Sequence, residues 1–393
     1  MNDEILDDLI EEQIEKRKST RKFSPRWGRI ILILLIAAAA LGVYLAYNRT
    51  TYHHYEIESR IKRPSSENTF YKSLGGRLFS YSRDGASLSS FDGNLVWTES
   101  FDMENPSCEV TGDYALVYDR ESTSALIFDS SGQVGSLAMT MPIVRASIAA
   151  NGDVAILMQN GETANLRMYS PEGKLIASGE VHARNTGYPV AMSISPDAKR
   201  LLVSLLDLND GDVKTTLCFY DFSDESDNET NHIAANFSYA DQVIPEVAFM
   251  KEGAVAFGDE ELIFFSDGKE IEVKKEVFLS EEAKLVFHSP GRVGVITTKE
   301  RESGKNENML YVYQSSGAER FSHRVPGNIM EAEFMRNDEI LVHNGKGIRI
   351  FRDDGTVKFG GRVEDPIRTV FPSDGQRNYY FITKDQSQKV VLH

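Results

Sequence analysis

The sequence predicts an all-β protein, a β-propeller of about eight four-stranded blades that follows one N-terminal transmembrane helix. Three observations predict this architecture: an uncharged apolar run near the N-terminus, a short hairpin pattern that recurs eight times, and a second hairpin pattern after seven of those copies. The chain has 393 residues, of which 41% are hydrophobic and 10% are aromatic. This composition is typical of a packed core and not of a disordered chain.

The uncharged run is Ile30–Tyr47, with the sequence IILILLIAAAALGVYLAY. At about 1.5 Å per residue, a helix of this length spans roughly 27 Å, close to the hydrocarbon thickness of a bilayer. We therefore expect residues 30–47 to be a transmembrane signal-anchor helix. A cleaved signal peptide is the alternative, but the seven acidic residues before the run are unusual for such a leader.

The charges on either side of this run predict its orientation. Only Arg49 follows the run before Arg60, whereas seven basic residues precede it: Lys16, Arg17, Lys18, Arg21, Lys22, Arg26 and Arg29. The positive-inside rule then makes residues 1–29 a cytoplasmic tail and places everything after the run outside the cell membrane. Because the tail holds seven acids and seven bases, the formal net charge of −16 belongs to the extracytoplasmic part. Nucleic acid is therefore not an expected partner.

The first repeated pattern is a polar turn between two runs that alternate apolar and polar residues. Its eight copies are YKSLGGRLFSY, CEVTGDYALVY, SIAANGDVAIL, SISPDAKRLLV, VAFMKEGAVAF, VFHSPGRVGVI, AEFMRNDEILV and TVFPSDGQRNYYFI. Their turns fall near Gly75, Gly112, Gly152, Asp197, Glu252, Gly291, Asn337 and Asp374. The intervals of 37 to 55 residues between them are in the range of a four-stranded propeller blade.

A second hairpin follows each of the first seven turns, as an aromatic-ended strand, a turn and another strand. The copies are SSFDGNLVW, LIFDSSGQV, RMYSPEGKL, CFYDFSDES, IFFSDGKEI, YVYQSSGAE and RIFRDDGTV. Glycine suits such short loops because one position commonly needs a positive φ. Two hairpins per repeat make one antiparallel blade. The fourth copy has no glycine and a longer acidic loop, Ser223–Thr230, so we expect this blade to be the most irregular.

The chain ends at KVVLH, where the third strand of the eighth repeat should be, so a fourth strand is missing. A closed ring then predicts that residues 48–65, a juxtamembrane segment, supply the missing strand within Tyr52–Ile61, and that residues 66–393 form the propeller. This closure leaves no open sheet edge. A seven-bladed ring with one incompletely paired unit is the alternative.

Some of these repeats resemble known propeller families. The stretch ISPDAKRLLV, from Ile194 to Val203, resembles the S-P-D-G-K-x-L motif of WD40-like and TolB-like repeats, with Ala198 in place of the motif's glycine. The turns YSPEGKL and FDGNLVW resemble PQQ-like repeats. The whole layout resembles an uncharacterised family of bacterial single-pass membrane proteins with a propeller ectodomain, which implies an architecture but no activity.

Catalytic and metal-binding signatures are absent from the sequence. It has no G-x-S-x-G elbow, P-loop, H-E-x-x-H or C-x-x-C motif. His53 and His54 would point to opposite faces of a strand, and Asp207–Val213 has glycine where a calcium loop needs an oxygen ligand. Cys108 and Cys218 suggest buried small side chains. We therefore predict no catalytic, cofactor-binding or metal residue, although carboxylates from different blades could converge without any linear spacing.

The function that this architecture favours is a non-catalytic binding or scaffolding module for a protein or cell-envelope component, held outside the membrane. One alternative is a propeller enzyme that acts on an envelope glycan or peptide. It would be supported by acids or histidines with opposed pKa shifts around the channel. The other is a ligand sensor that signals through residues 1–29.

Overall fold

The computed structural model describes residues 25–63, 68–182, 186–208, 211–223, 232–300 and 306–393. The chain forms two compact units, Met1–Thr51 and Tyr52–His393. Most of the predicted cytoplasmic tail, residues 1–24, lies outside the described residues, as does most of the acidic loop Ser223–Thr230.

The first unit contains one described helix, α2 (Pro25–Asn48), which includes the predicted span of residues 30–47. Within α2 the structure describes the side chains of residues 30–40 and 42. Among the described residues, no helix is both long enough and apolar enough to cross a membrane.

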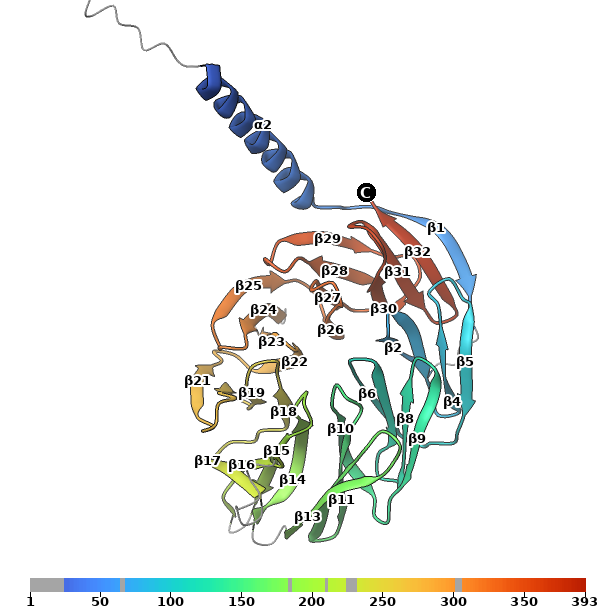
Figure 1. Ribbon diagram of the computed structural model, residues 1–393, viewed down its shortest axis with the longest axis vertical. Coiled ribbons are helices and arrows are strands. Elements are labelled where there is room, and N and C mark those ends of the chain that lie inside the picture. Colours follow the sequence, from blue (N-terminus) through green and yellow to red (C-terminus); the bar gives the residue numbers. More distant parts are fainter. Residues whose placement is uncertain (1–24, 64–67, 183–185, 209–210, 224–231, 301–305) are drawn as a thin grey trace, which may run out of the picture. The chain divides into compact units, whose positions relative to one another are not determined.

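The second unit consists of eight four-stranded antiparallel sheets, each a blade, arranged around an axis (Figure 1). The first four blades are β2 (Phe70–Leu74), β3 (Arg77–Tyr81), β4 (Gly85–Ser89) and β5 (Leu95–Ser100); β6 (Pro106–Thr111), β7 (Tyr114–Asp119), β8 (Ser124–Asp129) and β9 (Gly132–Ala138); β10 (Ile143–Ile148), β11 (Val154–Asn160), β12 (Thr163–Tyr169) and β13 (Leu175–His182); and β14 (Tyr188–Ile194), β15 (Arg200–Asp207), β16 (Lys214–Asp221) and β17 (Ile233–Ala240). The last four are β18 (Glu246–Phe249), β19 (Ala254–Phe257), β20 (Glu261–Phe265) and β21 (Val273–Phe278); β22 (Ala283–Ser289), β23 (Arg292–Glu300), β24 (Asn306–Gln314) and β25 (Glu319–Val325); β26 (Glu331–Phe334), β27 (Ile340–His343), β28 (Gly347–Phe351) and β29 (Val357–Arg362); and β30 (Ile367–Pro372), β31 (Asn378–Thr383) and β32 (Gln386–Leu392) with β1 (Tyr55–Lys62). Eight blades confirm the predicted propeller, and the seven-bladed alternative is wrong.

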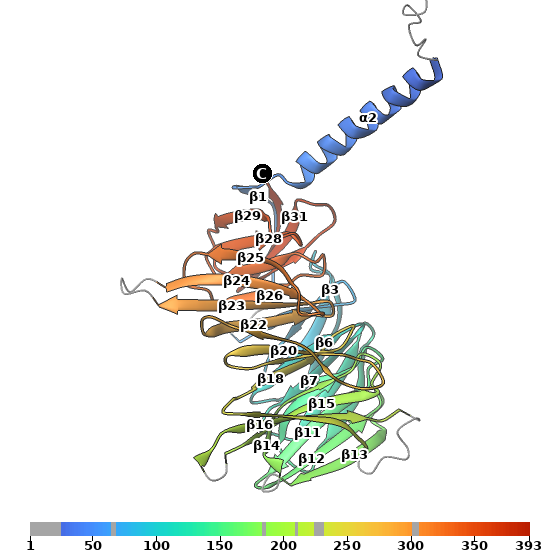
Figure 2. The ribbon, with the colours of Figure 1, turned by 90° about the vertical axis from the view of Figure 1, so that its left-hand side faces the viewer.

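The burial of each strand follows its place in the blade. The second strands are covered on both faces by neighbouring blades, so β11 and β19 are nearly continuous runs of buried apolar residues. The outermost strands face solvent on one side, and β17 accordingly alternates between exposed and half-buried residues. Seen from the side, β26, β22, β18 and β14 follow one another along the ring (Figure 2).

Apolar clusters between neighbouring blades form the core. Each of the eight adjacent pairs of blades shares one cluster, as where Leu116 of β7 packs in the same cluster as Ile156 of β11. The cluster between the eighth and first blades is small, and there Phe91 stacks on Tyr380 with ring centroids 4.8 Å apart. The series of clusters is therefore continuous around the ring.

The strand that the last repeat lacks is supplied by β1. It pairs antiparallel with β32, from Tyr55 opposite Leu392 to Lys62 opposite Gln386. Directly after β1, the half-buried Arg63 donates hydrogen bonds to the first blade, at Ser89 Oγ (2.8 Å) and at the carbonyl oxygens of residues 90 and 91 (3.0 and 2.9 Å). The N-terminal strand thus completes the last blade and joins it to the first.

Candidate functional site

The first strand of each blade lies nearest the axis of the ring (Figure 1). Residues of these inner strands line a cavity of about 480 Å³, the central channel, which borders β2, β6, β18, β22, β26 and β30. Its titratable lining residues are Lys72, Glu246, His288, Glu331, Glu333 and Arg336. Residues from six different blades therefore converge on one space.

Glu109 lies on β6, the innermost strand of the second blade. Its carboxylate accepts hydrogen bonds from Ser147 Oγ (3.0 Å) and from the backbone N–H of Ile148, both on the next blade. Ser147 Oγ in turn accepts the N–H of Ile194 at 3.3 Å. Burial outweighs these bonds and raises the pKa of Glu109 to about 7. Glu109 can therefore hold or release a proton near neutral pH.

Glu331 and Glu333 lie two residues apart on β26, so their side chains point to the same face of the strand. His343 Nε2 lies 3.4 Å from Glu331 Oε2, and this contact lowers the pKa of Glu331. The Nε2 atom of His343 carries the proton, because its Nδ1 accepts the N–H of Gly345.

The pKa of Glu333 shifts in the direction opposite to that of Glu331. Its pKa is raised mainly by burial, although Lys72 and a 2.6 Å hydrogen bond from Thr369 both lower it. Two neighbouring glutamates on one strand therefore carry opposite pKa shifts.

Two further groups extend this inner layer to other blades. Burial raises the pKa of Glu246, an effect that Arg145 partly offsets. Burial lowers the pKa of His288 and so favours its neutral form. The arrangement suits proton transfer or recognition of polar groups. No cluster of three or more His, Cys, Asp or Glu residues suited to a metal ion occurs within the described ranges.

The described residues that the sequence singled out do not line this cavity. The backbone N–H groups of His53 and His54 both donate to the carbonyl oxygen of His393, at 3.1 Å each, and so join the two ends of the propeller chain. Cys108 is half-buried on β6, Cys218 is buried on β16, and neither forms a disulfide. In the loop Asp207–Val213, residues 209 and 210 lie outside the described part of the chain.

Sequence reasoning missed the acids of the inner strands, although one signal marks them. Glu109, Glu246, Glu331 and Glu333 all lie in the first strand of a repeated hairpin, where apolar residues are the rule. A carboxylate at such a position has to face either the core or the channel. A search for acids in the first strand of each repeat would have selected these four residues from the other acids of the chain.

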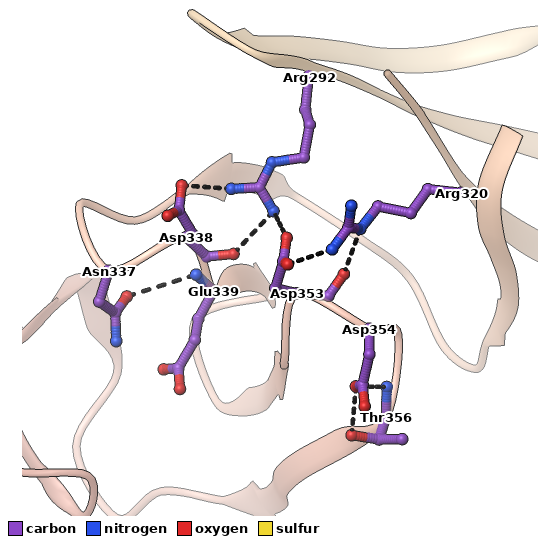
Figure 3. Close-up of polar contacts among 8 residues, drawn as sticks. All are labelled: Arg292, Arg320, Asn337, Asp338, Glu339, Asp353, Asp354 and Thr356. Carbon is purple, nitrogen blue, oxygen red and sulfur yellow. Dashed lines mark hydrogen bonds and ion pairs between the residues drawn. The ribbon is translucent and has the colours of Figure 1, made fainter. Parts of the chain in front are cut away.

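The densest charged network of the described residues joins the sixth and seventh blades (Figure 3). Arg292 contacts the carboxylates of Asp338 and Asp353 and donates to the backbone oxygen of Asp338 at 3.1 Å. Arg320 contacts the same Asp353 carboxylate and donates to its backbone oxygen at 2.8 Å. Each arginine has partners within the protein, so these ion pairs stabilise the contact between the two blades.

A family model described as "Family of unknown function (DUF5711)" matches residues 47–392 of the chain. No curated protein sequence matches the chain.

Several solved structures share the propeller fold. BamB from Moraxella catarrhalis is 11% identical with a TM-score of 0.52, over 86% of this chain and 100% of that one. The computationally designed Ika8 protein is 11% identical with a TM-score of 0.52, over 84% and 98%. A eukaryotic initiation factor is 13% identical with a TM-score of 0.51, over 86% and 87%. At these identities the likeness shows the fold alone.

Proposed function

The chain belongs to the family of unknown function DUF5711, and we propose that it is a non-catalytic binding or scaffolding module for a protein or a cell-envelope component. The fold supports this proposal in a general way. Apolar clusters join every neighbouring pair of blades, so the ring can hold many loops in fixed positions. Such a platform suits recognition over a broad surface.

One observation carries the proposal further. In an antiparallel blade the loop between the second and third strands lies on the same face of the ring as the loop to the next blade. The exposed basic residues described in these loops are Arg83, Arg120, Lys346 and Lys384. The exposed acidic residues described there are Asp84, Asp102, Glu104, Glu121, Glu162, Asp212, Asp241, Asp259, Glu260, Glu282, Glu364, Asp365 and Asp385. This acidic face favours a partner that carries basic groups.

We also propose that residues 30–47 anchor the protein in a bacterial cell membrane, with residues 1–29 in the cytoplasm and the propeller outside. The uncharged run and the basic residues before it support this location. The sensor alternative stays a prediction, because residues 1–24 lie outside the described part of the chain.

The test is recovery of a partner from the native membrane by crosslinking of the intact protein. The fifth blade offers a matched pair of triple variants with equal charge change. Asp259→Asn, Glu260→Gln and Glu282→Gln neutralise three acids of the acidic face. Glu252→Gln, Glu270→Gln and Glu272→Gln neutralise three acids of the opposite face. We expect one stoichiometric partner that is lost from the first variant and kept by the second. Equal recovery by both variants, or no partner, would contradict the proposal.

A second candidate, an enzyme that acts on an envelope glycan or peptide, is favoured by the opposed pKa shifts of Glu331 and Glu333 at the channel cavity. Hydrolysis of such a substrate by the intact protein should fall at least about 100-fold in Glu333→Gln if that residue is a general acid. Hydrolysis that is absent, or unchanged in this variant, would exclude this candidate.

A further inference from the structure

A small crevice between the sixth and seventh blades stands out because no acidic residue is among the described residues that line it. Its volume is about 290 Å³, and it lies between the loop after β25 and strands β28 and β29. The chain has 59 acidic residues, so a polar crevice without one is an unusual environment in this protein.

Of the described residues that line this crevice, Arg349 on β28 alone carries a permanent positive charge. Its side chain is half-buried, and it makes no hydrogen bond or ion pair with any residue that the structure describes. Burial lowers the pKa of Arg349, and no neighbouring acid opposes this effect. A partly desolvated cation without a counter-ion is costly, and a bound anion would offset that cost.

Two asparagines of the same crevice present hydrogen-bond donors. Asn344 Oδ1 accepts the backbone N–H groups of Lys346 (3.3 Å) and Gly347 (2.7 Å), and Asn328 Oδ1 accepts from Lys284 Nζ at 3.0 Å. Both amide oxygens already accept hydrogen bonds within the protein, so each asparagine can offer its amide NH₂ group to a ligand. Together with the guanidinium they form a set of side-chain donors suited to a ligand that only accepts hydrogen bonds.

Gly360, directly opposite Arg349 in the β28–β29 pairing, leaves space beside it. Its backbone is not in the left-handed region, and an added Cβ would lie at ordinary contact distances, 3.8 Å from Val357 Cγ1 and 4.0 Å from Arg349 Cγ. Neither backbone conformation nor crowding thus requires glycine here. Glycine inside a strand weakens the sheet, and one reason for its presence is the close approach of a ligand.

We propose that this crevice binds a carboxylate group, with Arg349 as its charged partner and the amides of Asn328 and Asn344 as further donors. A guanidinium matches the planar carboxylate with two parallel hydrogen bonds. One guanidinium balances one negative charge, so a carboxylate suits the crevice better than a phosphate dianion. The volume accommodates a small acid or the end of a peptide but not a larger ligand. This inference is independent of the proposed scaffolding role.

The test uses saturation-transfer difference NMR on the full chain in detergent, at constant ionic strength set with chloride. The probes are acetate, acetyl-diglycine with a free carboxylate, and acetyl-diglycine amide. We expect both acids to bind and the amide not to bind. Affinity for the acids should fall at least tenfold in Arg349→Gln, and also in Gly360→Val, which fills the space but keeps the charge. Arg377→Gln makes the same charge change at an exposed turn and should bind as the wild type does.

The outcomes also distinguish the two sources of a carboxylate. Tighter binding of the peptide acid than of acetate would assign the crevice to a peptide terminus, and equal binding would assign it to a free small acid. Three results would overturn the proposal: equal signals from acid and amide, undiminished acid binding in Arg349→Gln with a wild-type melting temperature, or no acid binding at millimolar concentration.

Discussion

Replacement of Glu109 by glutamine should make the protein more stable at alkaline pH and leave its stability unchanged at acidic pH. In the folded protein the pKa of Glu109 is about 7, compared with an ordinary value of 4.5. Between these two values the folded state holds a proton that the unfolded chain releases, so the free energy of unfolding falls as pH rises through this interval. Glutamine cannot ionise, but its side-chain oxygen can still accept the hydrogen bonds from Ser147 and Ile148.

The magnitude follows from the width of that interval. At about 1.4 kcal/mol per pH unit the upper limit is roughly 3 kcal/mol, and because Glu109 is only half-buried, solvent reduces the expected gain to about 2 kcal/mol. For a protein of this size that gain corresponds to a rise in Tm of roughly 2–3 °C.

The assay is thermal unfolding of the full chain in detergent at pH 5, 6, 7 and 8, followed by circular dichroism at one scan rate. The difference in Tm between Glu109→Gln and the wild type should be near zero at pH 5 and should grow up to pH 8. Glu104→Gln, at an exposed residue in the preceding loop, is the matched control and should show no such trend. A difference that is constant with pH, or a wild type more stable than the variant at pH 8, would refute the reasoning.

Three further variants test individual contacts through the free energy of unfolding. Arg63→Gln removes the charged hydrogen bonds between the end of β1 and the first blade, and should lower the free energy of unfolding by about 2 kcal/mol. A loss under half of that would show that these hydrogen bonds are dispensable. Arg292→Gln should cost only about 1 kcal/mol, because the partner carboxylates are 73% and 45% exposed and water can solvate them, and a cost above about 3 kcal/mol would contradict this view. Ala198→Gly should raise stability by about 0.5–1 kcal/mol, since Ala198 has a φ of 59°, and a decrease would show that the turn does not store this strain.

The propeller could be predicted because its signals are local. Each blade repeats two hairpins, and their turns carry residues that tolerate positive φ, such as Gly75 and Gly152. Ala198 adopts the same left-handed region, which explains why the motif that it resembles has glycine at that position. The second strands are buried on both faces, so their apolar runs are conspicuous in the sequence.

The channel and the crevice could not be predicted, because their residues meet only after the ring closes. Thr369 binds Glu333 from the next blade, and Ser147 binds Glu109 in the same way, so no spacing along the chain records either pair. Arg349 alternates with buried isoleucines on β28 and resembles any half-exposed strand residue in the sequence. Whether Arg349 has an ion-pair partner depends on residues of the neighbouring blade, and the local sequence around Arg349 does not reveal them. Fold therefore follows from local pattern here, whereas the candidate sites depend on contacts between blades.

The central claim is that the N-terminal strand closes an eight-bladed ring, and a disulfide between β1 and β32 tests it most directly. Ser59 lies opposite Lys389, and paired residues on antiparallel strands are within reach of a disulfide. With Cys108 and Cys218 replaced by alanine, the full chain with Ser59→Cys and Lys389→Cys should crosslink within one molecule under mild oxidation. Ser59→Cys with Val391→Cys, shifted by two residues on the same face, should crosslink far less. Equal crosslinking of the two pairs, or crosslinks only between molecules, would contradict the closed ring.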